Sequence, residues 1–260
     1  RYAEDELTQI YLRKCIREGH SNGYLKAVSW LSPSQRRRAI WRYWEAKALG
    51  ELGMSESAQI WNELSKERGF HGFLAAEHLD FPYALNQQST RISSDYGSDE
   101  LSDVGFLRAK ELLALDRHQE AKEQWRHSIK RLPLRKRLIM GRWGLDKGWP
   151  DLATDAANVG GSWDRLDLRF PRSDWTSFLR AGSADEVSPF LLISIARRES
   201  ALYPFAVSRA GALGLMQLMP ATAKYVSRKR SLPYRRSGLF DPSISIKLGA
   251  AYYTELKKRY

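Results

Sequence analysis

The 260-residue sequence holds a single cysteine, Cys15. One cysteine excludes an intramolecular disulfide and a multi-cysteine metal site, so we expect Cys15 to be a small residue that packs between helices. The five histidines all precede residue 130 and have no ligand-like spacing with cysteines or carboxylates. We therefore expect no metal site and no cofactor.

Long apolar runs and strand patterns are also missing. No uninterrupted apolar stretch is as long as the roughly 18 residues that a membrane-spanning helix needs, so we expect no transmembrane segment. No signal peptide is visible in this chain. Residues up to about 182 are rich in Ala, Leu, Arg, Glu and Gln and lack sustained alternation, which predicts an all-α protein.

The net charge of +12 and the pI near 9.8 predict an anionic partner or surface. Nucleic acid, acidic lipid and acidic cell-wall polymer all satisfy that requirement, and the charge does not choose among them. Nucleic acid has no further support, because no RNA-binding aromatic motif, zinc-finger spacing or basic zipper accompanies the charge. The basic clusters 36–38 and 135–137 are most simply solvated helix faces.

Three segments, residues 43–61, 106–125 and 141–157, resemble one another as pairs of helices joined by a short turn. Each places small residues where the paired helices would touch and aromatic residues where the hairpins would pack, which is typical of helical repeats. The pattern breaks into Pro, Gly and Ser over residues 168–183, which predicts a linker. We therefore expect a helical-repeat region over residues 1–182 and a second domain over residues 183–260.

The most informative residue is Glu199. Ser188 and Pro189 predict the start of a helix that continues through it. The residues three, four and seven positions before it are apolar: Ala196, Ile195 and Leu192. We expect its carboxylate to project from a buried stripe, where desolvation raises the pKa of a carboxyl toward the range that suits a general acid. A lone glutamate on such a face is, however, more often a partly exposed or salt-bridged residue.

No Asp or Glu occurs from Ser200 through Phe240, so any chemistry of this segment rests on one carboxylate. The segment predicts a loop over residues 203–210, a short apolar helix around residues 214–219, and a new helix from Pro220. A final helix is expected after Asp241, with Pro242 at its first position.

Residues 199–223, ESALYPFAVSRAGALGLMQLMPATA, resemble the signature of the soluble lytic transglycosylases. Residues 168–171, 239–242 and 248–252 are similar to the large periplasmic members of that family. The resemblance implies an α-superhelix of helical hairpins followed by a goose-lysozyme-like α domain. It also implies a periplasmic enzyme of the Gram-negative cell envelope, with peptidoglycan glycan strands as substrate and other cell-wall enzymes as candidate partners.

By resemblance, Glu199 is the single general acid and base, and Ser208, Gln217 and Met219 bind the substrate. The implied reaction cleaves the MurNAc–GlcNAc β-1,4 bond and leaves a 1,6-anhydroMurNAc end. A hydrolytic goose-type muramidase, which uses a similar lone glutamate, is the alternative among enzymes. A non-catalytic helical-repeat scaffold that binds wall polymer is the alternative from another class.

The sequence departs from the family pattern at two points. Ser245 stands where the family usually has Asn. The catalytic domain of the family also runs past the equivalent of Tyr260 and includes a Tyr-Asn-Ala-Gly segment that this chain lacks. We therefore expect residues 183–260 to be the N-terminal part of an incomplete lysozyme-like domain, truncated at its C-terminus.

Overall fold

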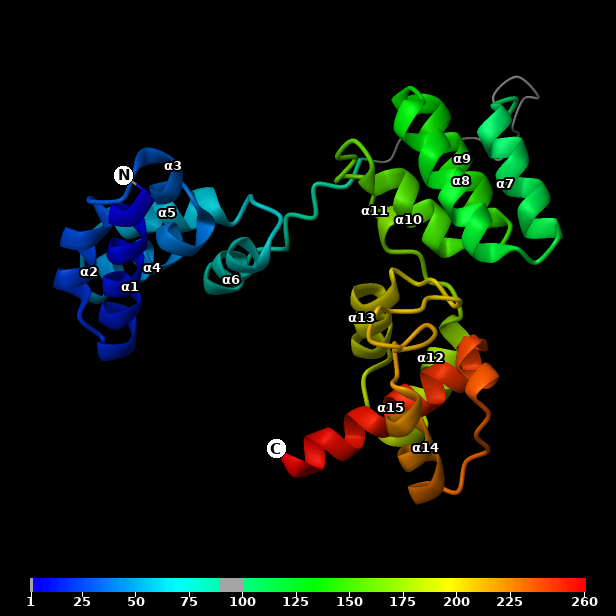
Figure 1. Ribbon diagram of the computed structural model, residues 1–260. Coiled ribbons are helices and arrows are strands. Elements are labelled where there is room, and N and C mark those ends of the chain that lie inside the picture. The colour runs from blue at the N-terminus through cyan, green and yellow to red at the C-terminus, as the bar shows by residue number, and fades with distance from the viewer. Residues whose placement is uncertain (1, 89–100) are drawn as a thin grey trace. The chain divides into compact units, whose positions relative to one another are not determined.

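The computed structural model describes residues 2–88 and 101–260 and is all-α over those ranges, which confirms the expected fold class (Figure 1). The described residues form fifteen α-helices and one 3₁₀ helix, and no β-strand. Their nearest approach to a sheet is two isolated antiparallel bridges, Val207 with Leu213 and Leu213 with Leu218. The chain divides into two compact units, residues 1–87 and 88–260.

The first unit consists of six helices. They are α1 (Tyr2–Glu18), α2 (Ser21–Val28), α3 (Pro33–Arg36), α4 (Ala39–Glu51), α5 (Glu56–Leu64) and α6 (Phe70–His78). Helices α4 and α5 form the first expected hairpin. They touch at small residues: Ala46 is fully buried, Ser57 Oγ donates to its carbonyl oxygen at 2.8 Å, and Gly50 faces Ser57. Cys15 is buried among helices, as expected.

The second unit begins with two further hairpins. Its helices here are α7 (Val104–Ala114), α8 (His118–Arg131), α9 (Leu134–Asp146), α10 (Pro150–Asn158) and α11 (Leu166–Arg169). Trp125 is fully buried between the hairpins, and its Nε1 donates to the carbonyl oxygen of Leu152 at 3.1 Å. Gly141 allows α9 to approach α10, because a Cβ there would lie 2.8 Å from that of Ala156. The predicted small residues therefore set the spacing of the helices, and this tryptophan forms core.

The C-terminal part of the second unit has a core of its own. It contains α12 (Trp175–Asp185), α13 (Pro189–Ser200), α14 (Pro220–Lys229), the 3₁₀ helix η1 (Arg236–Phe240) and α15 (Pro242–Arg259). Its core joins these helices to the segment between α13 and α14, with these side chains fully or almost fully buried: Phe178, Leu192, Leu202, Leu215, Leu239 and Ile246. The segment after Glu199 is thus part of the core and not a free loop.

Helix α12 continues through residues 182 and 183, where the sequence analysis places the boundary between the two domains. The division into residues 1–182 and 183–260 stays a prediction. None of the helices in the described ranges combines the length and the apolar composition that crossing a bilayer requires.

Candidate active site

Helix α13 begins where the sequence predicts and continues through Glu199. Ser188 precedes it, Pro189 occupies its first position, and the next two residues after its end, Ala201 and Leu202, adopt left-handed backbone conformations with φ of 54° and 64°. Such residues cannot continue a right-handed helix. Glu199 therefore lies in the last turn of α13, just before the chain reverses.

Glu199 is exposed, and the expectation that it projects from the buried stripe is wrong. The buried line of α13 runs through Leu192 and Ala196 at a spacing of four and continues to the partly buried Ser200. Glu199 and Ile195 lie one position earlier, about 100° around the helix from that line. The carboxylate consequently borders the core and faces solvent.

Ser200 connects the end of α13 to the following segment. Its Oγ donates to the carbonyl oxygen of Leu215 at 2.8 Å and lies 3.1 Å from that of Ala196. Since Leu215 is buried in the core, this contact fixes the middle of the segment beside the residue that follows Glu199.

Ser208 closes a tight loop. Its backbone N–H donates to the carbonyl oxygen of Ala212 at 2.9 Å, and its Oγ accepts from the N–H of Ala212 at 2.9 Å. Gly211, with φ of 88°, makes the reversal between them. In this second bond the Ser208 hydroxyl is the acceptor and does not use its hydrogen. The side chain can therefore still donate to a ligand.

Gln217 belongs to a turn and not to the short helix expected around residues 214–219. Gly214 and Gln217 both have positive φ, 74° and 47°, which breaks a right-handed helix, and paired backbone bonds between Leu213 and Leu218 close the turn. The Nε2 of Gln217 donates to the carbonyl oxygens of Ala206 and Gly214 at 3.1 and 2.9 Å. These bonds set the amide plane of Gln217.

Met219 follows this turn as the residue before α14, and 42% of its surface is exposed. Glu199 therefore lies in the last turn of α13, and Ser208, Gln217 and Met219 lie on the folded segment between that helix and α14. Two hydrogen bonds hold the segment in its shape. Ser200 Oγ donates to the carbonyl oxygen of Leu215, and the N–H of Gly214 donates to the carbonyl oxygen of Ala206 at 2.9 Å.

Helix α15 and the 3₁₀ helix hold this segment from the other side. Ser245, fully buried, accepts the backbone N–H of Met216 at 3.1 Å, so the residue that departs from the family pattern still serves the loop. Gly249 leaves room for the Met216 side chain. Gly214 packs directly on the carbonyl group of Leu239, where a Cβ would lie 1.7 Å from the oxygen. The close approach at Gly214 is thus to the protein's own backbone.

The segment after Glu199 also contacts the helical hairpins, which the sequence analysis did not anticipate. Lys122 Nζ on α8 lies 4.3 Å from the centroid of the Tyr203 ring, and the ring of His118 stacks on that of Phe205 at 3.8 Å. Burial, with a smaller effect of the nearby Asp151 carboxylate, raises the pKa of Tyr203 to about 12. No local pattern marks these contacts, since some 80 positions separate the partners along the chain.

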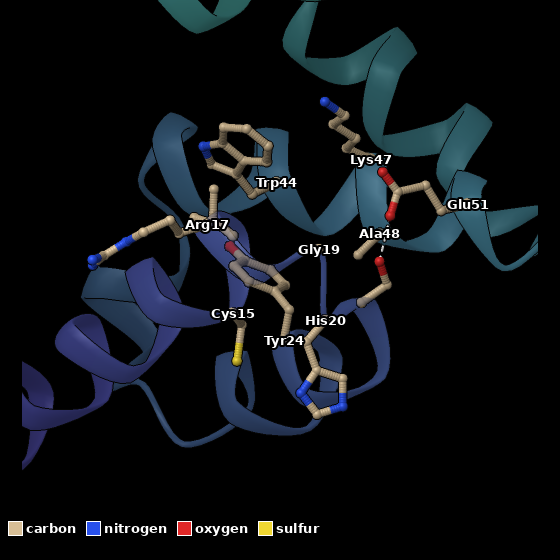
Figure 2. A pocket seen from close by; sticks show the side chains of 11 residues that line it. Cys15, Arg17, Gly19, His20, Tyr24, Trp44, Lys47, Ala48 and Glu51 are labelled. Carbon is tan, nitrogen blue, oxygen red and sulfur yellow. Dashed lines mark hydrogen bonds between the residues drawn. The ribbon is translucent and has the colours of Figure 1, made fainter.

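Two hollows in the described residues lie away from this segment. One of about 280 Å³ in the first unit is lined by side chains that include Tyr24, Trp44 and Glu51, the last of which accepts a hydrogen bond from Ser21 (Figure 2). Another, of about 430 Å³, lies between α12 and α15. Neither contains any of the four predicted site residues. Over residues 2–88 and 101–260, no three His, Cys, Asp or Glu side chains group as metal ligands would.

Two family models match the second unit. Residues 101–166 match the soluble lytic murein transglycosylase L domain, and residues 176–260 match the transglycosylase SLT domain. The chain is also 35% identical, over 260 residues, to a putative soluble lytic murein transglycosylase of Haemophilus influenzae. The chain belongs to the soluble lytic murein transglycosylase family.

Other members of the soluble lytic murein transglycosylase family agree with this placement. The enzyme of Escherichia coli K12 is 30% identical over 249 residues. Two solved structures each superpose with a TM-score of 0.88 over 98% of this chain: the inactive mutant of the lytic transglycosylase Slt of Pseudomonas aeruginosa, 29% identical, and the 70 kDa soluble lytic transglycosylase of E. coli, 28% identical.

The chain spans less than half the length of these relatives. The match with the Haemophilus protein covers 98% of this chain and 42% of that protein. The match with the E. coli K12 enzyme covers 95% of this chain and 38% of that enzyme. In the two solved structures it covers 42% and 41% of the respective chains.

Proposed function

We propose that the protein carrying this chain is a peptidoglycan lytic transglycosylase, with Glu199 as its single general acid and base. The observation that carries the proposal is the position of Glu199: an exposed carboxylate at the end of a helix that packs one side into the core, next to a segment whose own hydrogen bonds hold Ser208 and Gln217 in place. The family match of residues 176–260 to the SLT domain supports it.

In the proposed reaction, the Glu199 carboxyl donates its proton to the glycosidic oxygen between MurNAc and GlcNAc, and the bond from that oxygen to C1 of MurNAc breaks. The N-acetyl group of the sugar assists departure, as in substrate-assisted glycosidases. The 6-hydroxyl oxygen then bonds to C1, and its proton returns to Glu199. No water is consumed, and the product ends in 1,6-anhydroMurNAc.

A single carboxylate is sufficient for this sequence of steps. Glycosidases with two carboxylates need the second one as nucleophile or as base for water, about 5–9.5 Å from the first. The segment from Ser200 to Phe240 contains neither Asp nor Glu. An intramolecular hydroxyl and acetamido group replace the functions of that second carboxylate.

The other site residues take supporting roles in this proposal. The hydroxyl of Ser208 donates to the substrate, because its oxygen already accepts a backbone N–H. The carbonyl oxygen of the Gln217 side chain accepts from the acetamido N–H, since the Nε2 is used by Ala206 and Gly214. Met219, exposed, offers an apolar surface to a sugar ring. Because peptidoglycan is the proposed substrate and the relatives from Haemophilus influenzae and Escherichia coli belong to Gram-negative bacteria, we place the protein in the periplasm of a Gram-negative cell.

Substitution of Glu199 tests the proposal. In the complete protein, Glu199→Gln removes the ionisable group but keeps the shape, and we expect release of soluble fragments from purified peptidoglycan to fall by about 100-fold or more. A solved relative from P. aeruginosa that carries one Glu-to-Gln substitution is described as inactive, which supports this expectation.

Glu186→Gln is the matched control, because Glu186 is an exposed glutamate in the same unit, at the end of α12. It should release fragments at the wild-type rate, and both variants should melt at the wild-type temperature. Undiminished release by the Glu199→Gln variant would exclude Glu199 as the acid.

A further inference from the structure

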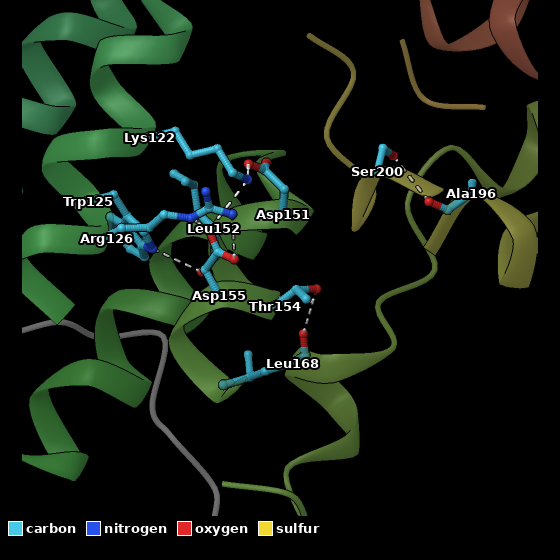
Figure 3. Close-up of polar contacts among 10 residues, drawn as sticks. All are labelled: Lys122, Trp125, Arg126, Asp151, Leu152, Thr154, Asp155, Leu168, Ala196 and Ser200. Atoms are coloured by element: carbon cyan, nitrogen blue, oxygen red, sulfur yellow. Dashed lines mark hydrogen bonds and ion pairs between the residues drawn. The ribbon is translucent and has the colours of Figure 1, made fainter. Parts of the chain in front are cut away.

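A buried cluster of charged side chains joins helices α8 and α10. Lys122 is 5% exposed and Asp151 is completely buried, and the two are hydrogen-bonded through Nζ and Oδ2 (Figure 3). Lys122 Nζ also lies 3.4 Å from Oδ2 of Asp155, which accepts a 2.8 Å hydrogen bond from Arg126 Nε. Buried ions are costly to desolvate, and apolar residues could join two helices as well. Joining the two helices therefore does not by itself explain why these side chains are charged.

The cluster faces the segment that follows Glu199. The Lys122 ammonium lies 4.3 Å from the centroid of the Tyr203 ring, within the range of a cation–π interaction, and Tyr203 is only 5% exposed. Asp151 and Asp155 keep the ammonium in that position. Two buried oxygens have no hydrogen-bond partner among the described residues: Oδ1 of Asp151 and the hydroxyl of Tyr203. Lys122 therefore contacts Tyr203 through the ring and not through the hydroxyl.

The first residue of α8 makes a second contact with the same segment. The His118 ring stacks on that of Phe205, with centroids 3.8 Å apart and planes inclined by 10°. The ring of Trp149 is also near His118, with centroids 5.2 Å apart. Lys122 and His118 are four residues apart and therefore lie on one face of α8. That face supports Tyr203 and Phe205 together.

The supported segment does not hold its shape by local preference. Ala201 and Leu202 have positive φ values of 54° and 64°, a conformation that residues with a Cβ rarely adopt, so surrounding contacts must maintain it. Directly after Phe205, the carbonyl oxygen of Ala206 accepts from the N–H of Gly214 and from Nε2 of Gln217. The segment is therefore the covalent and hydrogen-bonded connection between Glu199 and Gln217.

We propose that His118 and the Lys122–Asp151 pair are positioning residues, which fix residues 203–206 and through them the placement of Gln217 relative to Glu199. The proposal rests on the proposed function for its effect on catalysis. Under this proposal, helices α8 and α10, which precede the SLT domain, help to position residues of the active site. Misplacement of catalytic groups by about 1 Å can lower a rate by about 100-fold, so the support from α8 is expected to act on kcat.

The test uses two pairs of variants in the complete protein. His118→Ala removes the stacked ring, whereas His118→Phe keeps a ring and loses only a 3.7 Å contact of Nε2 with the exposed Asp116, because Nδ1 has no hydrogen-bond partner among the described residues. Lys122→Met with Asp151→Asn removes both charges at once and leaves neither ion unpaired. Arg126 and Asp155 remain paired in that double variant. Glu186→Gln serves again as the unchanged control.

Hydrogen–deuterium exchange of residues 203–217 and steady-state kinetics on peptidoglycan are both measured. We expect His118→Ala and the double variant to exchange faster in residues 203–217 and to lose about tenfold to 100-fold in kcat, with KM within about twofold of wild type. His118→Phe should recover most of both. Melting temperatures identify any variant that fails to fold, and the other variant then decides.

Wild-type exchange in both variants overturns the proposal, and so does faster exchange with an unchanged kcat. If the wild-type protein itself does not act on peptidoglycan, the proposed function fails, while the exchange data still decide whether α8 positions the segment.

Discussion

Two glycines in the segment between α13 and α14 have different reasons to be glycine. Gly211 has φ of 88° and open space around the position of a Cβ, so its backbone conformation is the only demand. Gly214 has φ of 74°, and a Cβ would lie 1.7 Å from the carbonyl oxygen of Leu239. A side chain at Gly214 would therefore push the turn that carries Gln217 away from η1.

Alanine substitutions separate these two demands. Gly211→Ala should lower the free energy of unfolding by roughly 1–2 kcal/mol, the cost of a left-handed backbone for a residue with a Cβ. Gly214→Ala adds displacement of a core backbone contact and should reach on the order of 4–5 kcal/mol, the range of the most damaging single substitutions. Urea unfolding followed by circular dichroism measures both. Equal losses in the two variants would show that contact with Leu239 is unimportant.

At the same scale, Glu199 shows how far the sequence could predict the site. The motif predicts four site residues; Glu199 lies in the last turn of α13, the other three lie between α13 and α14, and their roles stay a prediction. Apolar residues three, four and seven positions back do not reveal which line of the helix is buried. The core continues from Ala196 to Ser200, because Ser200 can bond the carbonyl of Leu215 while its backbone stays helical. That carbonyl comes from fifteen residues further along the chain.

The start of α15 is the element whose stability depends most plainly on pH. Asp241 precedes Pro242 and accepts hydrogen bonds from Ser243 Oγ at 2.6 Å and from the N–H of Ile244 at 3.1 Å. These bonds hold the pKa of Asp241 below its ordinary value. Because the folded-state pKa is lower than the unfolded one, this contribution to stability is present above about pH 4 and is lost as the pH falls through the folded-state pKa.

Asp241→Ala should therefore lower the free energy of unfolding near neutral pH by about 0.5–1 kcal/mol, at the low end for a helix cap because Asp241 is exposed to solvent. The difference from wild type should shrink as the pH is lowered through 4 toward 3. Thermal unfolding across that range measures it. Asp241→Asn, which keeps an acceptor oxygen without the charge, is the control and should lose less. A wild-type advantage that stays constant down to pH 3 would contradict the assignment.

Among the elements, the helices with a proline at the first position are the most predictable. The predicted starts at Pro189, Pro220 and Pro242 all agree with the structure, because the proline ring fixes a helical φ where no N–H is needed. The apolar run at residues 214–219 misled the prediction. Whether a short apolar run forms a helix or a turn depends on φ at Gly214 and Gln217, which the contacts with Leu239 and Ala206 decide.

For the whole molecule, the second unit joins two regions that family models describe separately. The L-domain match ends at residue 166, the SLT match begins at residue 176, and the contacts of α8 with Tyr203 and Phe205 connect them within one compact unit. The repeats along the sequence predict the hairpins. They could not predict this contact, because nothing in a single hairpin specifies which later loop will cover it.

The central claim is that one carboxylate closes the substrate's own hydroxyl onto C1, so that no water enters the product. The most direct measurement is a digest of purified peptidoglycan by the complete protein in ¹⁸O-labelled water, with mass spectra of the released fragments. We expect fragments that end in 1,6-anhydroMurNAc, lighter by one water than hydrolysed fragments and free of ¹⁸O. Fragments that carry a full water with ¹⁸O at C1 of MurNAc would show a hydrolytic muramidase and contradict the account.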